Sequence, residues 1–186
     1  MFMNPKRLFD CIDYQLQHMP LEDMLAGKEN GIWKKYSTQQ VKDTVDQLAA
    51  GLLNIGISAN DMSIEGRDKV AILSSNRPEW LMVDMAVQKI GAVLTPIYPT
   101  TNINELQFIL NDVQAKIIFV SDKTLFEKIA SIQAAVPSLQ NIFTFDPVEE
   151  ATYWKDILQK TTPESITAVN TISQKIKYED LATIIY

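Results

Sequence analysis

Apolar and polar residues follow two different rhythms along the chain. In the segment 6–17, and again after Ser37, apolar residues recur every three or four positions, which predicts amphipathic helices. Between them, the segment 21–36 predicts two short strands joined at Asn30 and Gly31, because Asn-Gly supplies the positive backbone angles of a tight hairpin. The chain should therefore open with a helix and a β-hairpin.

The helix that follows Ser37 has the strongest signal. Ser37 and Gln40 have capping-box spacing, and Gly56 suits the left-handed position after the last turn. An apolar stripe predicts the face that packs on the core: Val41, Val45, Leu48, Ala49 and Leu52.

Beyond residue 68, short apolar runs alternate with helical patterns. Strands are expected at 69–74, 91–98, 116–120 and 141–145, with helices after Pro78, Asn102 and Asp122 and a shorter one at 153–160. Strands separated by helices imply right-handed crossovers and parallel pairing. We therefore predict an α/β fold, with a mainly parallel doubly wound sheet and flanking helices.

The same pattern divides the chain into three parts. Residues 1–160 form the α/β subdomain, with helix and hairpin in 1–36 and alternating elements in 37–160. Residues 161–177 are rich in Thr, Ser, Gln and Asn and predict a linker. Residues 178–186 regain apolar character and predict the start of a strand, which either pairs with a sheet edge or frays.

Composition narrows the function only by exclusion. The formal charge of −6 argues against a nucleic-acid partner, which needs clustered Lys and Arg. Cys11 is the single cysteine and cannot form an internal disulfide, so a reducing cytoplasmic location is the default. We expect neither a secretory signal nor a transmembrane segment, because apolar runs stay well short of the ~18 residues of a membrane span. A parent enzyme resting on a membrane surface is compatible with this.

Self-contained chemistry is missing from the sequence. The six glycines form no Gly-x-Gly pair and no phosphate loop of the Gly-x-x-x-x-Gly-Lys kind. One Cys and one His cannot supply the donors of a zinc site. Ser74, Ser75 and Ser121 follow strands, where we expect them to cap helices. We therefore predict no catalytic, cofactor-binding or metal-binding residue within the chain.

Several short motifs occur together at a familiar spacing. They are Tyr36 to Val41, Ala49 to Leu52, Asp68 to Ile72, Asn76 to Trp80, Ala92 to Thr100 and Leu110 to Asp112. Together they resemble the N-terminal region of the AMP-forming, adenylate-forming (ANL-type) acyl-CoA synthetases. The run Ile97 to Thr100 is similar to the long-chain fatty acid–CoA ligases, and 178–186 resembles the lead-in to that family's phosphate-binding loop.

The resemblance implies an incomplete N-terminal subdomain of an ATP-dependent ligase. Such an enzyme joins a fatty acid to the α-phosphate of ATP, then transfers the acyl group to coenzyme A, with Mg²⁺ supporting the phosphates. The loop that would hold ATP is not in the sequence, so the chain alone should be inactive and bind none of these cofactors. Tyr98 and Thr100 are expected near the substrate. Scaffold roles are expected for the other motif residues: Asn76, Arg77, Pro78, Glu79, Trp80, Pro96 and Pro99.

Two other functions fit the alternation of strands and helices. One is a free-standing flavodoxin-like domain that binds a ligand, which tight nucleotide binding would reveal. The other is a noncatalytic protein-interaction module of the same fold, which a ligase-coding region downstream would exclude. As a fragment, the chain should have the remainder of its parent as partner, and an uncovered apolar edge should favour self-association.

Overall fold

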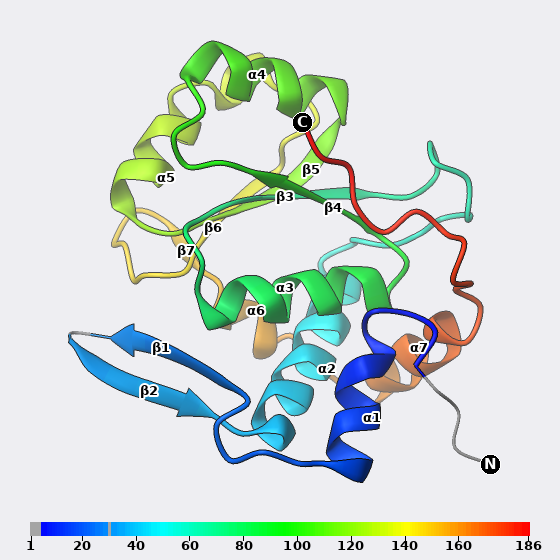
Figure 1. Cartoon of the computed structure of the whole chain (residues 1–186). Helices are drawn as coiled ribbons and strands as arrows, with labels where there is room; N and C mark the ends of the chain where they lie inside the picture. The colour runs from blue at the N-terminus through cyan, green and yellow to red at the C-terminus, as the bar shows by residue number, and fades with distance from the viewer. Residues whose placement is uncertain (1–4, 30) are drawn as a thin grey trace.

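A parallel sheet between two layers of helices organises the chain (Figure 1). The computed structural model describes residues 5–29 and 31–186. Its elements in chain order are α1 (Asp10–His18), β1 (Leu25–Glu29), β2 (Ile32–Tyr36), α2 (Thr38–Asn54), β3 (Lys69–Leu73), α3 (Pro78–Lys89), β4 (Val93–Ile97), α4 (Ile103–Asp112), β5 (Ala115–Val120), α5 (Lys123–Ala130), the 3-10 helix η1 (Gln133–Ala135), β6 (Asn141–Thr144), β7 (Thr152–Tyr153), α6 (Lys155–Leu158) and α7 (Pro163–Ser173).

The strand order confirms the predicted α/β fold. Within the described residues the main sheet has the order β4-β3-β5-β6-β7, and every neighbouring pair is parallel. The chain moves outward from β3 to β4, then crosses back over β3 to β5 and continues in the other direction. The direction of winding therefore reverses between β3 and β5, where ligands bind in many sheets of this kind.

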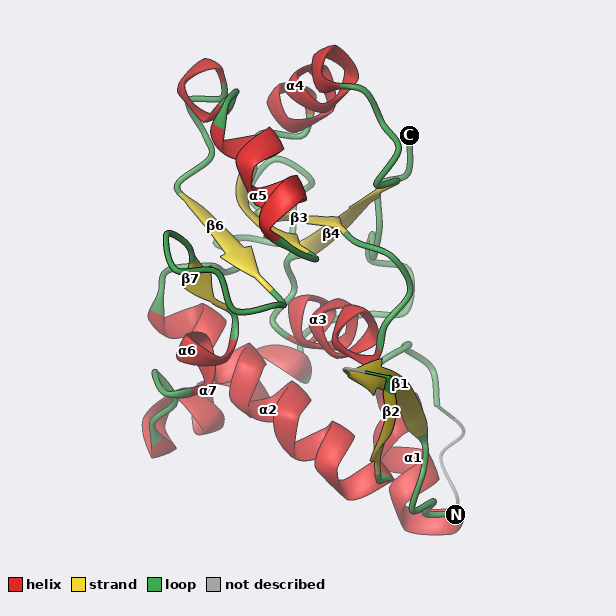
Figure 2. Ribbon diagram, turned by 90° about the vertical axis from the view of Figure 1, so that its left-hand side faces the viewer, coloured by secondary structure: helices red, strands yellow, loops and turns green. Residues whose placement is uncertain are grey.

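Each face of the sheet has its own apolar core. On one face, α4 and α5 pack Leu106, Leu110 and Ile129 against the sheet, above it in Figure 1. On the other, α3 lies directly on the sheet and α2 packs beneath it (Figure 2). Because α3 is enclosed by the sheet and by α2, apolar residues cover most of its surface.

Local signals in the first half of the chain are realised. The hairpin pairs β1 with β2, and Gly31 has a φ of 80°, although Asn30 lies outside the described residues. Ser37 accepts a hydrogen bond from the Gln40 backbone and the Gln40 side chain accepts one from the Ser37 backbone, which completes the capping box. Gly56 follows α2 with a φ of 86°.

The first helix begins later than the predicted residue 6. Asp10 accepts hydrogen bonds from the backbone N–H groups of Lys6 and Arg7, at 3.4 and 3.0 Å, so its carboxylate closes a turn before α1. A fifth sheet strand, β7, occupies two residues next to the predicted 153–160 helix, which is shortened to α6.

The segment 161–177, predicted as a linker, contains α7 instead. Thr162 caps it, because its hydroxyl accepts a hydrogen bond from the Ser165 N–H. In turn, the Ser165 hydroxyl accepts one from the Thr162 N–H. Val169 is buried, and Ile166 and Ile172 pack beside it on the core that α2 covers. The linker prediction was wrong because it rested on the polar composition of the segment. The few apolar residues all lie on one face of the helix, while Thr and Asn lie on the exposed face.

The segment 178–186 reaches the outer edge of β4 but forms no full strand. Leu94 donates to the Ala182 carbonyl at 3.1 Å and accepts from Ile184 at 2.9 Å, giving a single parallel bridge at Thr183. The next residue of β4 that faces this edge is Pro96, which has no N–H to donate. Of the two outcomes left open for this segment, pairing with a sheet edge or fraying, the structure shows pairing, which Pro96 limits to one bridge.

Within residues 5–29 and 31–186, no helix combines the length and apolar character needed to cross a bilayer.

Candidate functional site

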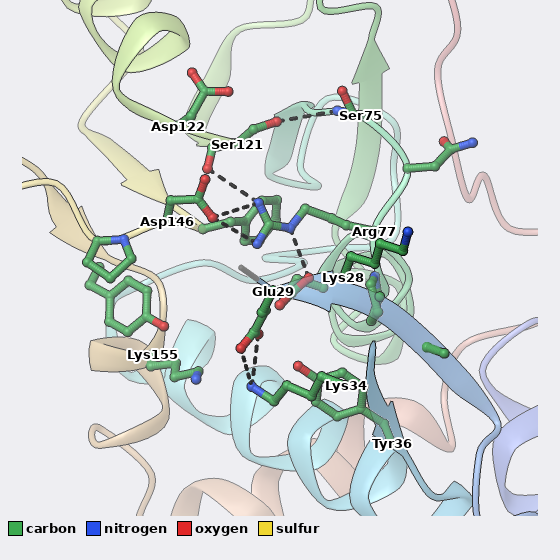
Figure 3. A pocket seen from close by; sticks show the side chains of 18 residues that line it. Lys28, Glu29, Lys34, Tyr36, Ser75, Arg77, Ser121, Asp122, Asp146 and Lys155 are labelled. Atoms are coloured by element: carbon green, nitrogen blue, oxygen red, sulfur yellow. Dashed lines mark hydrogen bonds and ion pairs between the residues drawn. The ribbon is translucent and has the colours of Figure 1, made fainter. Parts of the chain in front are cut away.

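A cleft of about 720 Å³ opens where the carboxyl ends of β3, β5 and β6 meet (Figure 3). The β1–β2 hairpin forms its opposite wall. The cleft therefore lies at the reversal point of the sheet, between loops that follow different strands. Its lining residues are Ala26, Gly27, Lys28, Glu29, Lys34, Tyr36, Ser75, Asn76, Arg77, Pro78, Glu79, Ser121, Asp122, Phe145, Asp146, Pro147, Tyr153 and Lys155.

The hairpin can form a wall because it approaches the start of α3 closely. Pro78 occupies the first turn of α3, where its missing N–H costs no hydrogen bond. A Cβ at Gly27 would lie 2.7 Å from Cδ of Pro78, well inside van der Waals contact. Glycine at this position therefore lets the hairpin pack against the helix and sets the width of the cleft.

Arg77 is the most extensively bonded cation of the cleft. Its Nε donates to Oε2 of Glu79 at 2.9 Å, and both terminal nitrogens reach Oδ1 of Asp146 at 3.1 Å (Figure 3). The guanidinium also lies 5.1 Å from the ring centroid of Phe145. Burial acts to lower the pKa of Arg77, but the hydrogen bond and charge of Glu79, together with Asp146, raise it. Arg77 thus ties the start of α3 to the loop after β6.

Three serines join the ends of β3 and β5 beside this arginine. Ser121 donates from Oγ to Oγ of Ser74 at 3.0 Å and accepts from the Ser75 N–H at 3.3 Å. The expected capping role is not what the structure shows, because Asp122, rather than Ser121, caps α5. The hydroxyls of Ser74 and Ser121 bond to one another across the two strand ends, and Ser75 joins them through its backbone N–H.

Charged groups of the hairpin occupy the other wall. Lys34 Nζ lies 2.9 Å from Oε1 of Glu29, and this hydrogen bond raises the pKa of Lys34 and lowers that of Glu29. Tyr36 lies beside them, half-buried, and burial raises the pKa of its hydroxyl. Because Lys34 and Glu29 neutralise one another, the hairpin wall is polar without a strong excess of either charge.

The cleft as a whole is balanced in charge. Of the described residues that line it, four are basic and four acidic: Lys28, Lys34, Arg77, Lys155, Glu29, Glu79, Asp122 and Asp146. None of these lining residues is His or Cys, so the serines have no imidazole or thiolate partner there. A polyphosphate would meet as many carboxylates as cations. The arrangement suits polar contacts or packing rather than covalent chemistry.

The structure brings part of the predicted motif to the cleft. Asn76, Arg77, Pro78 and Glu79 line it, and Arg77 donates to Glu79 there. Their scaffold role in the enzyme stays a prediction. Trp80 instead packs against the core beneath α3.

The expected substrate-proximal pair lies elsewhere. Tyr98 and Thr100 follow β4 at the edge of the sheet, where Tyr98 is 73% exposed, and neither lines the cleft. Pro96 lies within β4 on the edge side, a position that tolerates proline, and Pro99 separates Tyr98 from Thr100.

Sequence reasoning missed the hairpin's contribution to the cleft. Glu29 and Lys34 face each other only because Gly27 pairs with Lys34 in register, which no local pattern reveals. Asp146 had a detectable signal, since it directly follows the predicted strand 141–145. Within the described residues, no group of three or more His, Cys, Asp or Glu is placed to hold a metal ion.

Comparison with known proteins adds a family to this geometry. Residues 15–186 match the model of the family described as AMP-binding enzyme. The chain is 27% identical to a long-chain-fatty-acid–CoA ligase, FadD15, of Mycobacterium bovis, over 61% of this chain and 18% of that protein. It is 25% identical to fatty acyl-CoA synthetase A of Dictyostelium discoideum, over 75% of this chain and 20% of that protein. The chain spans about a fifth of the length of these curated relatives.

Solved structures share the fold. A long-chain-fatty-acid-CoA ligase, FadD1, of Archaeoglobus fulgidus superposes with a TM-score of 0.72 at 18% identity, over 100% of this chain and 35% of that one. The anthranilate CoA ligase AuaEII superposes with a TM-score of 0.67 at 19% identity, over 85% and 28%. Since the family model covers residues 15–186, the chain belongs to the AMP-binding enzyme family.

Proposed function

We propose that this chain is the N-terminal part of an AMP-forming long-chain fatty acid–CoA ligase. The observation that carries the proposal is the family match over residues 15–186, together with relatives that are named as ligases for long-chain fatty acids. The whole enzyme would convert a fatty acid, ATP and coenzyme A into acyl-CoA, AMP and pyrophosphate. A cytoplasmic location, at a membrane surface where the lipid is found, agrees with a single unpaired cysteine.

The residues of this chain do not fit ATP and Mg²⁺ by themselves. Arg77 and Lys34 are already paired with carboxylates, and the cleft carries no excess of positive charge. We therefore assign nucleotide, metal and coenzyme A binding to the rest of the enzyme, and to this chain the role of scaffold. Its partner is that remaining polypeptide.

The proposal is tested by acyl-AMP formation. The whole enzyme that contains this chain should show pyrophosphate exchange that depends on hexadecanoate, and residues 1–186 alone should show none. Anthranilate and acetate serve as competing acids, because one structural relative is an anthranilate CoA ligase. Preference for either acid over hexadecanoate would contradict the long-chain assignment, and acyl-AMP made by residues 1–186 would contradict the scaffold role.

We also propose that Tyr98 and Thr100 approach the substrate in the whole enzyme. Their exposure at the carboxyl end of β4 supports this, since that end of a parallel sheet is where ligands approach. Tyr98→Phe and Thr100→Val should raise the KM for hexadecanoate, while Phe108→Leu, on the exposed face of α4, serves as the control. An unchanged KM in both variants would remove the pair from the substrate site.

A further inference from the structure

A second pocket, of about 360 Å³, lies at the opposite end of the sheet from the cleft. It sits at the amino ends of β3 and β4, between the turn that precedes α1 and the segment that follows α7. Its lining residues are Pro5, Lys6, Arg7, Leu8, Phe9, Cys11, Arg67, Gln88, Ile176, Lys177, Tyr178, Asp180, Leu181 and Ala182. Nothing in the proposed ligase scaffold uses this pocket.

Arg67 in this pocket is deeply buried and poorly satisfied. Only 3% of the residue is exposed, and one hydrogen bond is made by its guanidinium, from Nε to the Gly91 carbonyl at 2.6 Å. In the part of the chain that the structure describes, the two terminal nitrogens have no hydrogen-bond partner, and no carboxylate lies within 4 Å of them. Burial lowers the pKa of Arg67, which the more distant charge of Asp180 only partly opposes.

The pocket concentrates positive charge on an acidic protein. Lys6, Arg7, Arg67 and Lys177 line it against one carboxylate, Asp180, although the chain carries a net charge of −6. Asp180 accepts the backbone N–H of Lys177 at 2.7 Å, so part of its charge is already engaged.

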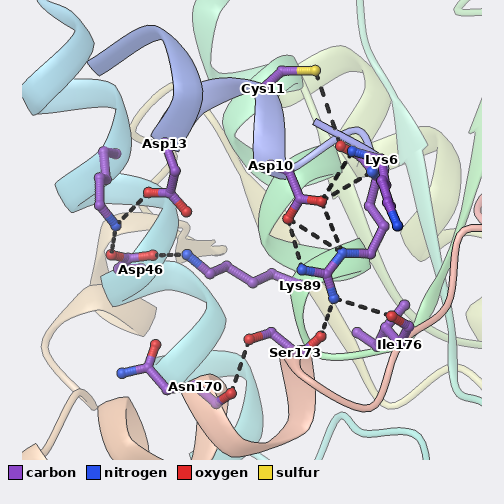
Figure 4. Close-up of polar contacts among 11 residues, drawn as sticks. Lys6, Asp10, Cys11, Asp13, Asp46, Lys89, Asn170, Ser173 and Ile176 are labelled. Atoms are coloured by element: carbon purple, nitrogen blue, oxygen red, sulfur yellow. Dashed lines mark hydrogen bonds and ion pairs between the residues drawn. The ribbon is translucent and has the colours of Figure 1, made fainter. Parts of the chain in front are cut away.

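Arg7 is better satisfied than the other cations of the pocket. It pairs with Asp10 at 2.7 Å and donates to the carbonyls of Ser173 and Ile176, which lie together in Figure 4. Arg67, Lys6 and Lys177 are therefore the groups that remain available to a ligand.

We propose that this pocket binds a small oxyanion, a phosphate or carboxylate group, on the two terminal nitrogens of Arg67. With Nε committed to Gly91, these nitrogens form an end-on pair whose spacing matches two oxygens of such a group. Lys6 and Lys177 add charge at the exposed mouth. The anion would give a buried guanidinium the counter-charge that the described protein does not place beside it.

The test is thermal unfolding of the chain in phosphate, acetate and chloride at equal ionic strength. A ligand at ten times its Kd should raise Tm by about 3–5 °C over chloride, because only the folded chain binds it. Phosphate also stabilises folded proteins without binding a site, so the stabilisation that the Arg67→Lys variant loses identifies which oxyanion the site prefers. Equal Tm values in all three salts would overturn the proposal.

Substitutions locate the effect. Arg67→Lys keeps a donor for Gly91 but loses the paired nitrogens, so affinity should fall about tenfold. Lys177→Gln should weaken binding about threefold through lost charge at the mouth. Lys123→Gln, an exposed lysine on α5, is the matched control and should change nothing. Equal stabilisation of the Arg67→Lys variant and the control would overturn the proposal.

Asp180→Asn distinguishes an anion site from an internal pair. Asparagine can still accept the Lys177 N–H, while the opposing charge disappears, so phosphate or acetate should bind several-fold more tightly. If Asp180 is instead the partner of Arg67, the variant should lose stability and respond to anions no more than the native chain. That result would contradict the proposed site.

Discussion

The two ends of the sheet hold arginines in contrasting states. At the carboxyl end, Arg77 contacts two carboxylates and one aromatic ring. At the amino end, Arg67 is more deeply buried, yet a single carbonyl is its hydrogen-bond acceptor within the described residues. The side-chain donors of Arg77 are bonded to other parts of the protein, whereas the two terminal nitrogens of Arg67 have no hydrogen-bond partner among the described residues. Burial alone therefore does not tell a structural arginine from one available to a ligand; the inventory of its partners does.

The largest expected effect comes from removing Arg77. Arg77→Met leaves Glu79, which is 5% exposed, charged and unpaired, so the free energy of unfolding should fall by about 3–5 kcal/mol. Urea unfolding measures it. Asp146→Asn is the control, because the Asp146 side chain is 56% exposed and should contribute less than about 1 kcal/mol. Equal losses in the two variants would show that Glu79 does not depend on Arg77.

A Cβ at Gly27 should disturb the hairpin wall next most strongly. Gly27→Ala places a methyl group 2.7 Å from Cδ of Pro78, so the unfolding free energy should fall by about 1–3 kcal/mol as the hairpin moves outward. Faster proteolysis within 25–36 should accompany the loss. The double variant Gly27→Ala, Pro78→Ala relieves the contact and should recover most of the stability. Failure to recover would place the cost elsewhere.

Removing Arg67 should cost less than removing Arg77. Arg67→Met deletes the hydrogen bond to Gly91, but it also removes a buried charge that no nearby carboxylate compensates. We expect a loss below about 1.5 kcal/mol in chloride buffer, measured by urea unfolding alongside Arg77→Met. A loss of unfolding free energy as large as that of Arg77→Met would show that Arg67 is as important to stability as Arg77, which contradicts the contrast between the two ends of the sheet.

The smallest effect concerns Asp84, whose neighbour Gln88 lines the pocket. Asp84 is 7% exposed, and burial raises its pKa, which the hydrogen bond from Gln88 only partly offsets. Folding favours the protonated form of Asp84. The stability that this form contributes is fully present below the unfolded pKa and is lost as pH rises through the folded pKa. Asp84→Asn should therefore raise Tm at pH 7 and flatten its fall between acidic and neutral pH.

Asp46 provides the comparison of opposite sign. Burial acts to raise its pKa, but hydrogen bonds from Lys42 and Lys89 lower it, so its contribution is present at neutral pH and lost in acid. Asp13, labelled near Asp46 in Figure 4, joins the same group because its Oδ1 lies 3.0 Å from Nζ of Lys42. Asp46→Asn should lower Tm at pH 7. If both substitutions shift Tm in the same direction, the assignment of the two carboxylates is wrong.

The sequence predicted elements whose signals are local. The capping box at Ser37, the glycine turns and the proline at the start of α3 each depend on neighbours within a few residues, and all appear in the structure. The alternation of strands and helices predicted the parallel sheet, because each element has its own local pattern of apolar residues. α7 was missed because its apolar face is sparse, and β7 because two residues carry no period.

The candidate site could not be predicted from the sequence, because it is built from contacts between residues that lie far apart along the chain. Arg77 meets Asp146 69 residues away, and Arg67 meets Gly91 24 residues away. No motif shows that the hairpin covers the ends of β3 and β5, since that position follows from the fit of Gly27 against Pro78. The expected substrate pair, Tyr98 and Thr100, followed from its place at the carboxyl end of a predicted strand, and its role stays a prediction.

Pro96 also determines how this protein can meet its own copies. At the outer edge of β4, the backbone groups of Leu94 already bond to Ala182 and Ile184. Two residues further along, Pro96 offers a second chain no N–H donor. Growth of a continuous intermolecular sheet stops there, as it does at many natural edges that carry proline. Clustering of these molecules through the outer edge of β4 must therefore use side chains instead of a continued backbone ladder, so fibrils should not grow from this edge.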